Sequence, residues 1–455
     1  MEFTRDFSTI PPQVEELAKL SVANSIIDPA LYQQYNVKRG LRDRDGKGVL
    51  TGLTEISEVW GHQVIDGVDT EIDGILRYRG YNVEDLIKGF PKNNNFSFEE
   101  VVYLLMFGQL PTAEQFAEFK ELMAGYRTLP IHFVRDIIMK APSKDMMNTL
   151  ARSVLTLYSY DQNSDDNSPE NVLRQCLELI ALFPQLSVYG YQTYKYYHDG
   201  DSFFIHPPLE EYSTAENILH MLRMDSSFSS LEAKVLDMAL VLHAEHGGGN
   251  NSTFTTHVVT SSGTDTYSST AAALGSLKGP RHGGANIKVI QQMAEMKETV
   301  SDWTDEEEVA AYLGRLLNRE AFDKAGLIYG LGHAIYTKSD PRARMLKEFV
   351  RKLSAEKGRE DEFALYETVE RIGPALVSGK RNTQKSICAN VDFYSGFAYD
   401  MLGLPRELYT PIFAIARIAG WSAHRMEEII NRGKIIRPAY MSICPPRDYV
   451  PFDER

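Results

Sequence analysis

The chain has 455 residues, of which 43% are hydrophobic and 24% are charged, and its formal net charge is −14 at pH 7. These values are ordinary for a soluble globular protein with one large domain or two smaller ones. Because no block of Lys and Arg stands out against the acidic excess, the sequence argues against a nucleic-acid partner, although local arginines can still bind an anionic ligand.

The predicted elements begin with a β-hairpin and continue as helices. Residues 60–80 alternate as in a strand, with Asp73-Gly74 as the expected tight turn. Downstream the hydrophobic period is helical. The predicted helices span residues 98–107, 113–126, 146–158, 172–183, 215–224, 231–245, 306–317 and 341–353. Their expected entry signals are Ser97, Thr112, Ser213 and Thr304. With no βαβ alternation and no internal repeat, the sequence predicts a mainly α fold with one small β-hairpin near the N-terminus.

Two glycine-rich segments each contain one histidine. His282 lies in Gly-Pro-Arg-His-Gly-Gly-Ala-Asn, between a predicted helix that ends at Lys278 and one that starts near Ala285. A neutral imidazole at the start of a helix can donate a hydrogen bond to an enolate, but the same position suits a histidine that only caps the helix. His333 follows a Gly-Leu-Gly turn, which suits a phosphate or an acyl thioester and also fits an irregular connection between helices.

Asp392 opens a predicted helix in Asn-Val-Asp-Phe-Tyr-Ser-Gly. An aspartate there is commonly an N-cap, whereas a general base needs apolar cover, which Phe393 and Phe397 can supply. Upstream, His243 and His246 share one helix face at a spacing that resembles a metal-binding pair. Because the His-Glu-x-x-His order and a third strong ligand nearby are both missing, we favour anion or hydroxyl binding over a metal for this pair.

Three arginines are candidates for binding carboxylates. Arg417 lies within the apolar segment 411–423, where a cation must find a partner or incur a large desolvation cost. No acid lies in that segment, so the partner is a distant side chain or an anionic ligand. Arg342, in Asp-Pro-Arg, and Arg437, in Ile-Ile-Arg-Pro, are similar candidates. Several arginines together with several histidines suggest a small di- or tricarboxylate, although a structural ion pair fits each arginine equally well.

Taken in order, these segments resemble citrate synthase. The resemblance covers residues 75–438 and includes Ile-Leu-Arg-Tyr-Arg-Gly, His-x-[Asp/Glu]-His, Gly-Pro-Arg-His-Gly-Gly-Ala-Asn, Gly-x-Gly-His followed by Asp-Pro-Arg, and Asn-Val-Asp-Phe-Tyr-Ser-Gly. It implies a multi-helical fold whose large α domain, residues 1–283 and 404–455, holds the dimer interface and the oxaloacetate site. The small α domain, residues 284–403, would hold the CoA side and the catalytic aspartate.

The resemblance also implies roles for the motif residues. His282 would donate a hydrogen bond to the thioester carbonyl of acetyl-CoA while Asp392 removes the methyl proton. The enol would attack the keto carbon of oxaloacetate, polarised by His333, and citryl-CoA would then be hydrolysed. The residues implied to bind oxaloacetate are His243, His246, Arg342, Arg417 and, reaching across a homodimer, Arg437. The residues implied to contact CoA are Arg281, Leu327, Ile328, Gly330, Leu331, Gly332, Lys385 and Asn390.

The expected activity is therefore that of a citrate synthase, an acyltransferase of the tricarboxylic acid cycle that needs no metal or other cofactor. A 2-methylcitrate synthase acting on propionyl-CoA is the alternative within the family, because one methylene changes binding by only about 1–3 kcal/mol. A metallohydrolase built on His243, His246 and Asp392 and a non-catalytic acyl-CoA-binding protein are the alternatives outside it.

Cysteine usage and the termini bear on the compartment. Cys176, Cys388 and Cys444 form no Cys-x-x-Cys pair, and this sparse, odd number favours a reducing environment. The N-terminal segment lacks the apolar core of a signal peptide, and Arg417 interrupts the 411–423 stretch. We expect a cytoplasmic protein that spans no membrane.

Overall fold

The computed structural model describes residues 8–43, 46–89, 97–382 and 385–455. Residues 1–53 and residues 54–455 form two separate units. In the first unit, α1 (Pro12–Ser25) and α2 (Pro29–Gln34) each begin with proline, whose fixed φ suits the first helical turn. Neither helix contains a buried residue, so the hydrophobic core of the described chain belongs to the second unit.

The second unit opens with a three-stranded antiparallel sheet. Its strands β1 (Ser57–Ile65), β2 (Val68–Tyr78) and β3 (Tyr81–Asn82) pair in the order β1-β2-β3. The turn between β1 and β2 is Asp66-Gly67, where both residues have positive φ, and the prediction of a turn at Asp73-Gly74 is wrong. Both Asp-Gly pairs suit a two-residue turn with positive φ, so local sequence did not distinguish them.

Glycines on both long strands let the sheet contact a distant segment at backbone distance. The N–H of Gly74, inside β2, donates to the Ser339 carbonyl oxygen at 3.1 Å. A Cβ at Gly74 would overlap that same oxygen, and a Cβ at Gly61 on β1 would overlap the Ile335 carbonyl oxygen. The sheet thereby holds residues 335–341, which lead directly into the predicted site residue Arg342.

The rest of the second unit is mainly helical, as the sequence predicted. Its helices are α3 (Val83–Gly89), α4 (Phe98–Phe107), α5 (Ala113–Gly125), α6 (Met146–Leu157), α7 (Pro169–Tyr194), α8 (Thr214–Leu222), α9 (Ser230–His243), α10 (Asn251–Thr260), α11 (Thr266–Lys278), α12 (Ala285–Thr299), α13 (Glu306–Leu317), α14 (Pro341–Lys357), α15 (Glu360–Arg381), α16 (Val391–Met401) and α17 (Tyr409–Asn431). Ser97 occupies the N-cap of α4, and Thr112 and Ser213 form capping boxes. The N-cap of α13 is Asp305 and not Thr304, because the Asp305 carboxylate accepts the first backbone N–H groups of the helix.

Helix α7 is longer than the sequence predicted. The predicted helix spans residues 172–183, but α7 (Pro169–Tyr194) continues to Tyr194 with Pro184 in its interior. An interior proline costs a helix about 3 kcal/mol, through the lost hydrogen bond and a steric clash. All residues of α7 from 183 to 190 are buried, and packing on that scale offsets this cost.

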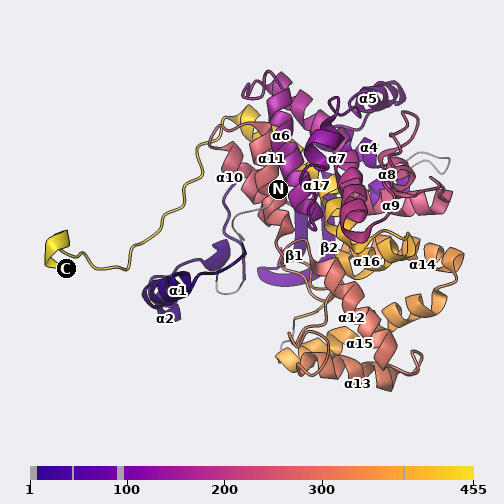
Figure 1. The fold of residues 1–455 in the computed structure, drawn as a ribbon. Helices are drawn as coiled ribbons and strands as arrows, with labels where there is room; N and C mark the ends of the chain where they lie inside the picture. The colour runs from indigo at the N-terminus through magenta and orange to yellow at the C-terminus, as the bar shows by residue number, and fades with distance from the viewer. Residues whose placement is uncertain (1–7, 44–45, 90–96, 383–384) are drawn as a thin grey trace. The chain divides into compact units, whose positions relative to one another are not determined.

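Helix α17 forms the centre of the core. Its residues 411–425 are all buried, and it packs against α4, α7, α9 and α10. Figure 1 shows α12, α13 and α15 together in the lower part of this unit, while α14 and α16 lie between them and α9. The domain boundaries expected at 283/284 and 403/404 stay a prediction. Within the described ranges, no helix has both the length and the apolar character needed to cross a bilayer.

Candidate active site

A loop after α13 pairs with the segment before α16, and this pairing brings two predicted catalytic residues into one region. The Gly332 N–H donates to the Cys388 carbonyl at 2.8 Å, and the Asn390 N–H donates to the Gly330 carbonyl at 2.9 Å. Gly330 has φ +84°, and a Cβ there would lie 2.6 Å from Phe393, so only glycine fits. This pairing fastens the loop that ends in His333 to the segment that leads into α16 and Asp392.

The ring of His333 has a defined orientation. Its Nδ1 accepts hydrogen bonds from the backbone N–H groups of Ile335 and Tyr336, each at 3.1 Å. The ring therefore presents an N–H donor at Nε2, which lies 3.5 Å from Nη2 of Arg342. The Tyr336 ring stacks on His333 with 4.7 Å between centroids, and its hydroxyl lies 3.2 Å from Nε2 of His246.

Arg342 is buried together with a counter-ion. Its Nη2 lies 2.7 Å from Oδ2 of Asp340, and the two side chains are 4% and 0% exposed. Asp340 also accepts the backbone N–H of Val391 at 3.2 Å, which ties α14 to α16. Burial disfavours the Arg342 charge, but the ion pair with Asp340 outweighs it and raises the pKa of the guanidinium. Arg342 therefore forms a structural ion pair, which was the alternative to ligand binding that the sequence left open. Its guanidinium also lies next to the His333 ring.

Arg417 has no such counter-ion at hydrogen-bond distance in the part of the chain that the structure describes. Its side chain is fully buried on α17, and its Nε donates to the His243 carbonyl at 2.7 Å. Among the described residues, Nη1 and Nη2 of this guanidinium have no hydrogen-bond partner. Burial lowers the pKa of Arg417 to about 10, so the group remains a cation at pH 7. Its guanidinium carbon lies 4.7 Å from the ring centroid of Phe413.

His243 and His246 are neutral. Both rings are buried, and burial together with the charges of Arg342 and Arg417 holds the pKa of each well below its ordinary value. Neither ring nitrogen of His243 has a partner among the described residues. A buried imidazole without a partner loses its hydrogen bonds to water, so an acceptor or donor on a ligand would stabilise it.

His282 does not cap the helix that follows it. The N-cap of α12 is Gly284, and Nε2 of His282 lies 3.0 Å from Oγ of Ser252. Oγ of Ser252 also accepts the indole N–H of Trp421 at 3.1 Å and donates to Oδ1 of Asn250 at 3.0 Å, so several groups fix its position beside the His282 ring. Burial, reinforced by the charge of Arg417, lowers the pKa of His282 to about 4, so the ring is a neutral donor at pH 7.

Asp392 is not a helix cap either. Asn390 takes the N-cap position of α16, and its side-chain oxygen accepts the Asp392 backbone N–H at 3.1 Å. Burial raises the pKa of the Asp392 carboxyl to about 6, against the lowering effect of the Arg342 charge. Such a carboxylate is mostly ionised at pH 7 and yet more basic than an exposed aspartate, as general-base catalysis requires.

The charge of Arg417 links these groups electrostatically. It acts on His243, His246, His282 and Asp392, and in each case it lowers the pKa. These side chains come from the end of α9, the loop before α12, α16 and α17. The fold therefore places these four side chains around one buried guanidinium, that of Arg417.

Other predicted residues lie outside this group or belong to the loop that positions His333. Arg437 is exposed on the segment after α17, and within the described chain no hydrogen bond or ion pair joins it to the site. Of the residues expected to contact CoA, the exposed ones are Arg281, Leu327 and Lys385. Ile328 is buried in the core, Leu331 is half-buried, and Gly330, Gly332 and Asn390 form the backbone pairing that positions His333.

Sequence reasoning missed three residues that orient the site: Ser252, Tyr336 and Asp340. Ser252 and its partner His282 are 30 positions apart, so no local pattern connects them. Asp340 had a detectable signal, because an aspartate directly before Pro-Arg suits both the N-cap of a helix and an ion pair with that arginine. Tyr336 had none that separates it from a core aromatic.

Donor geometry does not support a metal at His243, His246 and Asp392. Among the described residues, three donor atoms from His, Cys or carboxylate side chains lie within 4.8 Å of one another at a different place, formed by His257, His424 and Glu427. The metallohydrolase alternative therefore lacks a ligand set at the three residues that it requires.

Comparisons with known proteins point to one family. Residues 43–439 match the family model for the C-terminal domain of citrate synthase. The chain is 34% identical to the 2-methylcitrate synthase of Shewanella oneidensis over 89% of this chain and 98% of that protein. It is also 34% identical to the citrate synthase of Synechocystis sp. over 86% of this chain and 90% of that protein. The ternary complex of carboxymethyl coenzyme A and oxaloacetate with citrate synthase from Thermoplasma acidophilum is a structural neighbour, with a TM-score of 0.74, 27% identity, and coverage of 92% of this chain and 99% of that chain.

Proposed function

This chain belongs to the citrate synthase family, and we propose that it condenses acetyl-CoA with oxaloacetate to give citrate and free CoA. The family resemblance and the multi-helical fold predicted from the sequence are confirmed. The observation that supports the proposed substrate most directly is Arg417, whose Nη1 and Nη2 are buried without a partner among the described residues. A buried guanidinium in that condition favours an anionic ligand, because a carboxylate can accept both N–H groups at once.

Oxaloacetate suits the groups around Arg417. One carboxylate would bind Arg417, and the neutral rings of His243 and His246 would add hydrogen bonds. The second carboxylate would bind Arg342 and, in a dimer, the arginine at position 437 of the partner chain. The Nε2–H of His333 would donate to the keto oxygen, which makes the keto carbon more electrophilic. Support for these substrates comes from the structural neighbour bound to oxaloacetate and a CoA analogue.

The acid–base groups then account for carbon–carbon bond formation. Asp392 would accept the methyl proton of acetyl-CoA, while His282 donates a hydrogen bond to the thioester oxygen as negative charge develops there. A pre-aimed donor of this kind contributes about 3–4 kcal/mol, and a positioned base contributes roughly 10²–10⁴-fold in rate. The enol carbon attacks the polarised keto carbon, the new alkoxide takes its proton from His333, and water hydrolyses the thioester of citryl-CoA.

The same proposal covers the architecture and setting expected from the sequence. Domain closure of residues 284–403 onto residues 1–283 and 404–455 would exclude water and complete the CoA site. Residues 281, 327, 328, 330–332, 385 and 390 would contact CoA. The enzyme would act in the cytoplasm as a homodimer, and its chemistry needs no metal or other cofactor because imidazole and carboxylate groups supply every proton transfer.

A thiol-release assay with oxaloacetate and different acyl-CoA esters tests this function. We expect kcat/KM for acetyl-CoA to exceed that for propionyl-CoA by about tenfold or more, the usual effect of one methylene in a fitted pocket. Relatives at the same identity include a 2-methylcitrate synthase and a citrate synthase, so propionyl-CoA is the second candidate substrate. A reversed ratio would make the protein a 2-methylcitrate synthase, and no thiol release with either ester would contradict the proposed function.

Arg437→Ala is expected to raise the KM for oxaloacetate by about 10- to 100-fold, because hydrogen bonds between charged groups contribute about 1.5–3 kcal/mol. The KM for acetyl-CoA should stay near the wild-type value. Steady-state rates at varied oxaloacetate measure both constants. Arg447→Ala, also on the exposed C-terminal segment, is the matched control and should leave both unchanged. An unaltered oxaloacetate KM in Arg437→Ala would remove Arg437 from the site.

A further inference from the structure

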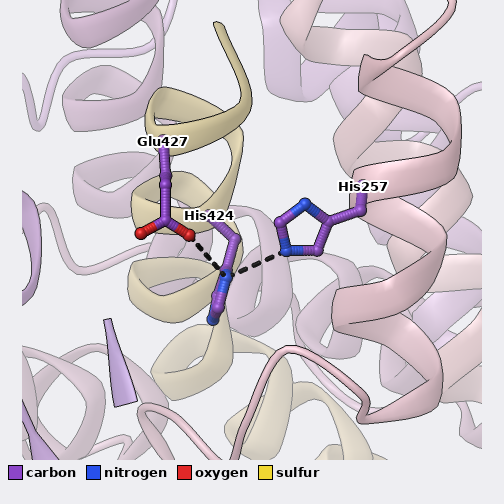
Figure 2. A group of neighbouring side chains, drawn as sticks. All are labelled: His257, His424 and Glu427. Carbon is purple, nitrogen blue, oxygen red and sulfur yellow. Dashed lines mark hydrogen bonds and ion pairs between the residues drawn. The ribbon is translucent and has the colours of Figure 1, made fainter. Parts of the chain in front are cut away.

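A second cluster of donor side chains lies where α10 meets α17. Figure 2 shows His257 of α10 facing His424 and Glu427 of α17. One donor atom from each residue lies within 4.8 Å of the other two. His257 Nε2 and His424 Nδ1 are 3.0 Å apart, and Glu427 Oε2 is 3.8 Å from His424 Nδ1. None of these three residues has a role in the proposed reaction.

Two further carboxylates determine which ring nitrogens hold protons. His257 Nδ1 lies 2.9 Å from Glu428 Oε2, and His424 Nε2 lies 3.1 Å from Glu245 Oε1. Because an ionised carboxylate only accepts hydrogen bonds, these two ring nitrogens are the N–H donors. The nitrogens left to bind another group are then His257 Nε2 and His424 Nδ1, which face each other at 3.0 Å. Two ring nitrogens that face each other in this way are joined either by a shared proton or by a metal ion.

The environment of Glu427 favours a metal ion over a proton shared between the two rings. Its Oε1 accepts the Glu55 backbone N–H at 2.8 Å, whereas its Oε2 is buried without a hydrogen-bond partner among the described residues. A proton shared by the two rings would satisfy only those rings. A metal ion would also bind the third donor, Oε2, which a proton shared by the rings leaves without a partner.

The surroundings of the cluster suit a small cation. The His424 and Glu245 side chains are fully buried, and those of His257 and Glu427 are 13% and 14% exposed, which leaves a route to solvent. Gly248 faces both imidazoles and adds no side chain on that side, so a water can serve as a fourth ligand.

Among the described residues, no Lys or Arg forms an ion pair with the carboxylates of this cluster, whose partners are the two histidines. Three carboxylates, those of Glu245, Glu427 and Glu428, contact the two rings, and two arginines of the surrounding core bind backbone carbonyl groups. Arg79 donates to the Leu105 carbonyl, and Arg417 donates to the His243 carbonyl. A divalent ion would offset this charge where the side chains are desolvated.

We propose that His257, His424 and Glu427 bind a divalent transition-metal ion, with zinc the best fit to two imidazole nitrogens and one carboxylate oxygen. Glu428 and Glu245 act as outer partners that fix the ring orientations, an arrangement typical of metal-bound histidines. The ion would join α10 to α17 and would touch no substrate. Its role is structural, and it is independent of the proposed condensation.

Metal binding by the full-length protein tests this site. After treatment with a chelator and dialysis, the wild-type protein is titrated with Zn²⁺ alone, and bound zinc and Tm are measured. We expect about one ion per chain and an increase in Tm, because a ligand that binds only the folded state stabilises it. Wild-type protein that retains no zinc at equimolar concentration would overturn the site and leave a shared proton as the explanation.

Substituted variants test which residues bind the ion. His257→Gln and Glu427→Gln should each weaken zinc affinity by at least about tenfold. His206→Gln, which alters a histidine outside the cluster, and Cys444→Ser, which removes the exposed thiol, should keep wild-type affinity. Unchanged affinity in His257→Gln would overturn the assignment. If a variant fails to fold, X-ray absorption of the zinc-loaded wild-type protein identifies the ligands instead. We expect two imidazole ligands and no sulfur. A sulfur ligand would contradict the site.

Discussion

Asp392→Asn is expected to lower kcat by about 10²–10⁴-fold while the protein remains folded. The amide keeps the shape of the carboxylate but cannot accept the methyl proton of acetyl-CoA. The Asp392 backbone N–H still binds the Asn390 side chain, so α16 keeps its N-cap. Steady-state rates at saturating oxaloacetate and acetyl-CoA measure the loss, and thermal unfolding measures the stability.

The stability of this variant has a predictable sign. Burial raises the pKa of Asp392 from 3.8 to about 6, so the ionised carboxylate destabilises the folded state at pH 7. Asp392→Asn should therefore unfold at the wild-type temperature or above it. Asp400→Asn, on the same helix but in an ion pair with Arg359, is the matched control and should keep wild-type turnover. Turnover near wild type in Asp392→Asn would contradict the role of this carboxylate as the base.

The pH dependence of the wild-type enzyme gives a second readout of the same group. Because the base acts in its ionised form, kcat/KM should be constant above about pH 6.5 and fall about tenfold per unit below pH 6, as Asp392 takes up a proton. His282, with a pKa of about 4, stays neutral through this range and adds no inflection there. A profile that is flat from pH 5 to pH 7 would exclude Asp392 as the titrating base.

His282→Ala is expected to lower kcat by about 10²–10³-fold, the usual effect of removing one donor to a developing oxyanion. Affinity for oxaloacetate should change little, since this ring is expected to contact the thioester. The exchange of acetyl-CoA methyl hydrogens with D2O, which reports enol formation directly, should fall by the same factor.

A matched control separates this catalytic effect from a packing effect. His220→Ala removes another half-buried ring, hydrogen-bonded to the Pro207 carbonyl, and should leave kcat unchanged. If His282→Ala slowed turnover but not hydrogen exchange, the ring would act after enol formation and the proposed role would be wrong.

Much of this protein follows from its sequence because the relevant signals are local. The capping boxes at Thr112 and Ser213 form within four residues, so the starts of α5 and α8 could be predicted. Helical periodicity marked most of the long helices, and the ordered motifs around His282, His333 and Asp392 were enough to indicate the family.

The choice between equivalent local signals came from tertiary contacts. Asp66-Gly67 and Asp73-Gly74 are the same dipeptide, and the turn is at the first because the second packs against the Ser339 backbone. Gly284 and Asn390 take the cap positions that the sequence had left open, which frees the His282 ring and the Asp392 carboxylate for the site.

The sequence by itself determined the class of fold, the family and the residue types of the acid–base set. Only the tertiary structure decided their states: the donor nitrogen of the His333 ring, the raised pKa of Asp392 and the guanidinium of Arg417 that lacks a partner at Nη1 and Nη2 among the described residues. It also brought together His257 and His424, which are 167 positions apart. The physical reason is that burial and hydrogen bonding between distant segments set the charge and proton position of a side chain, and neither depends on its neighbours along the chain.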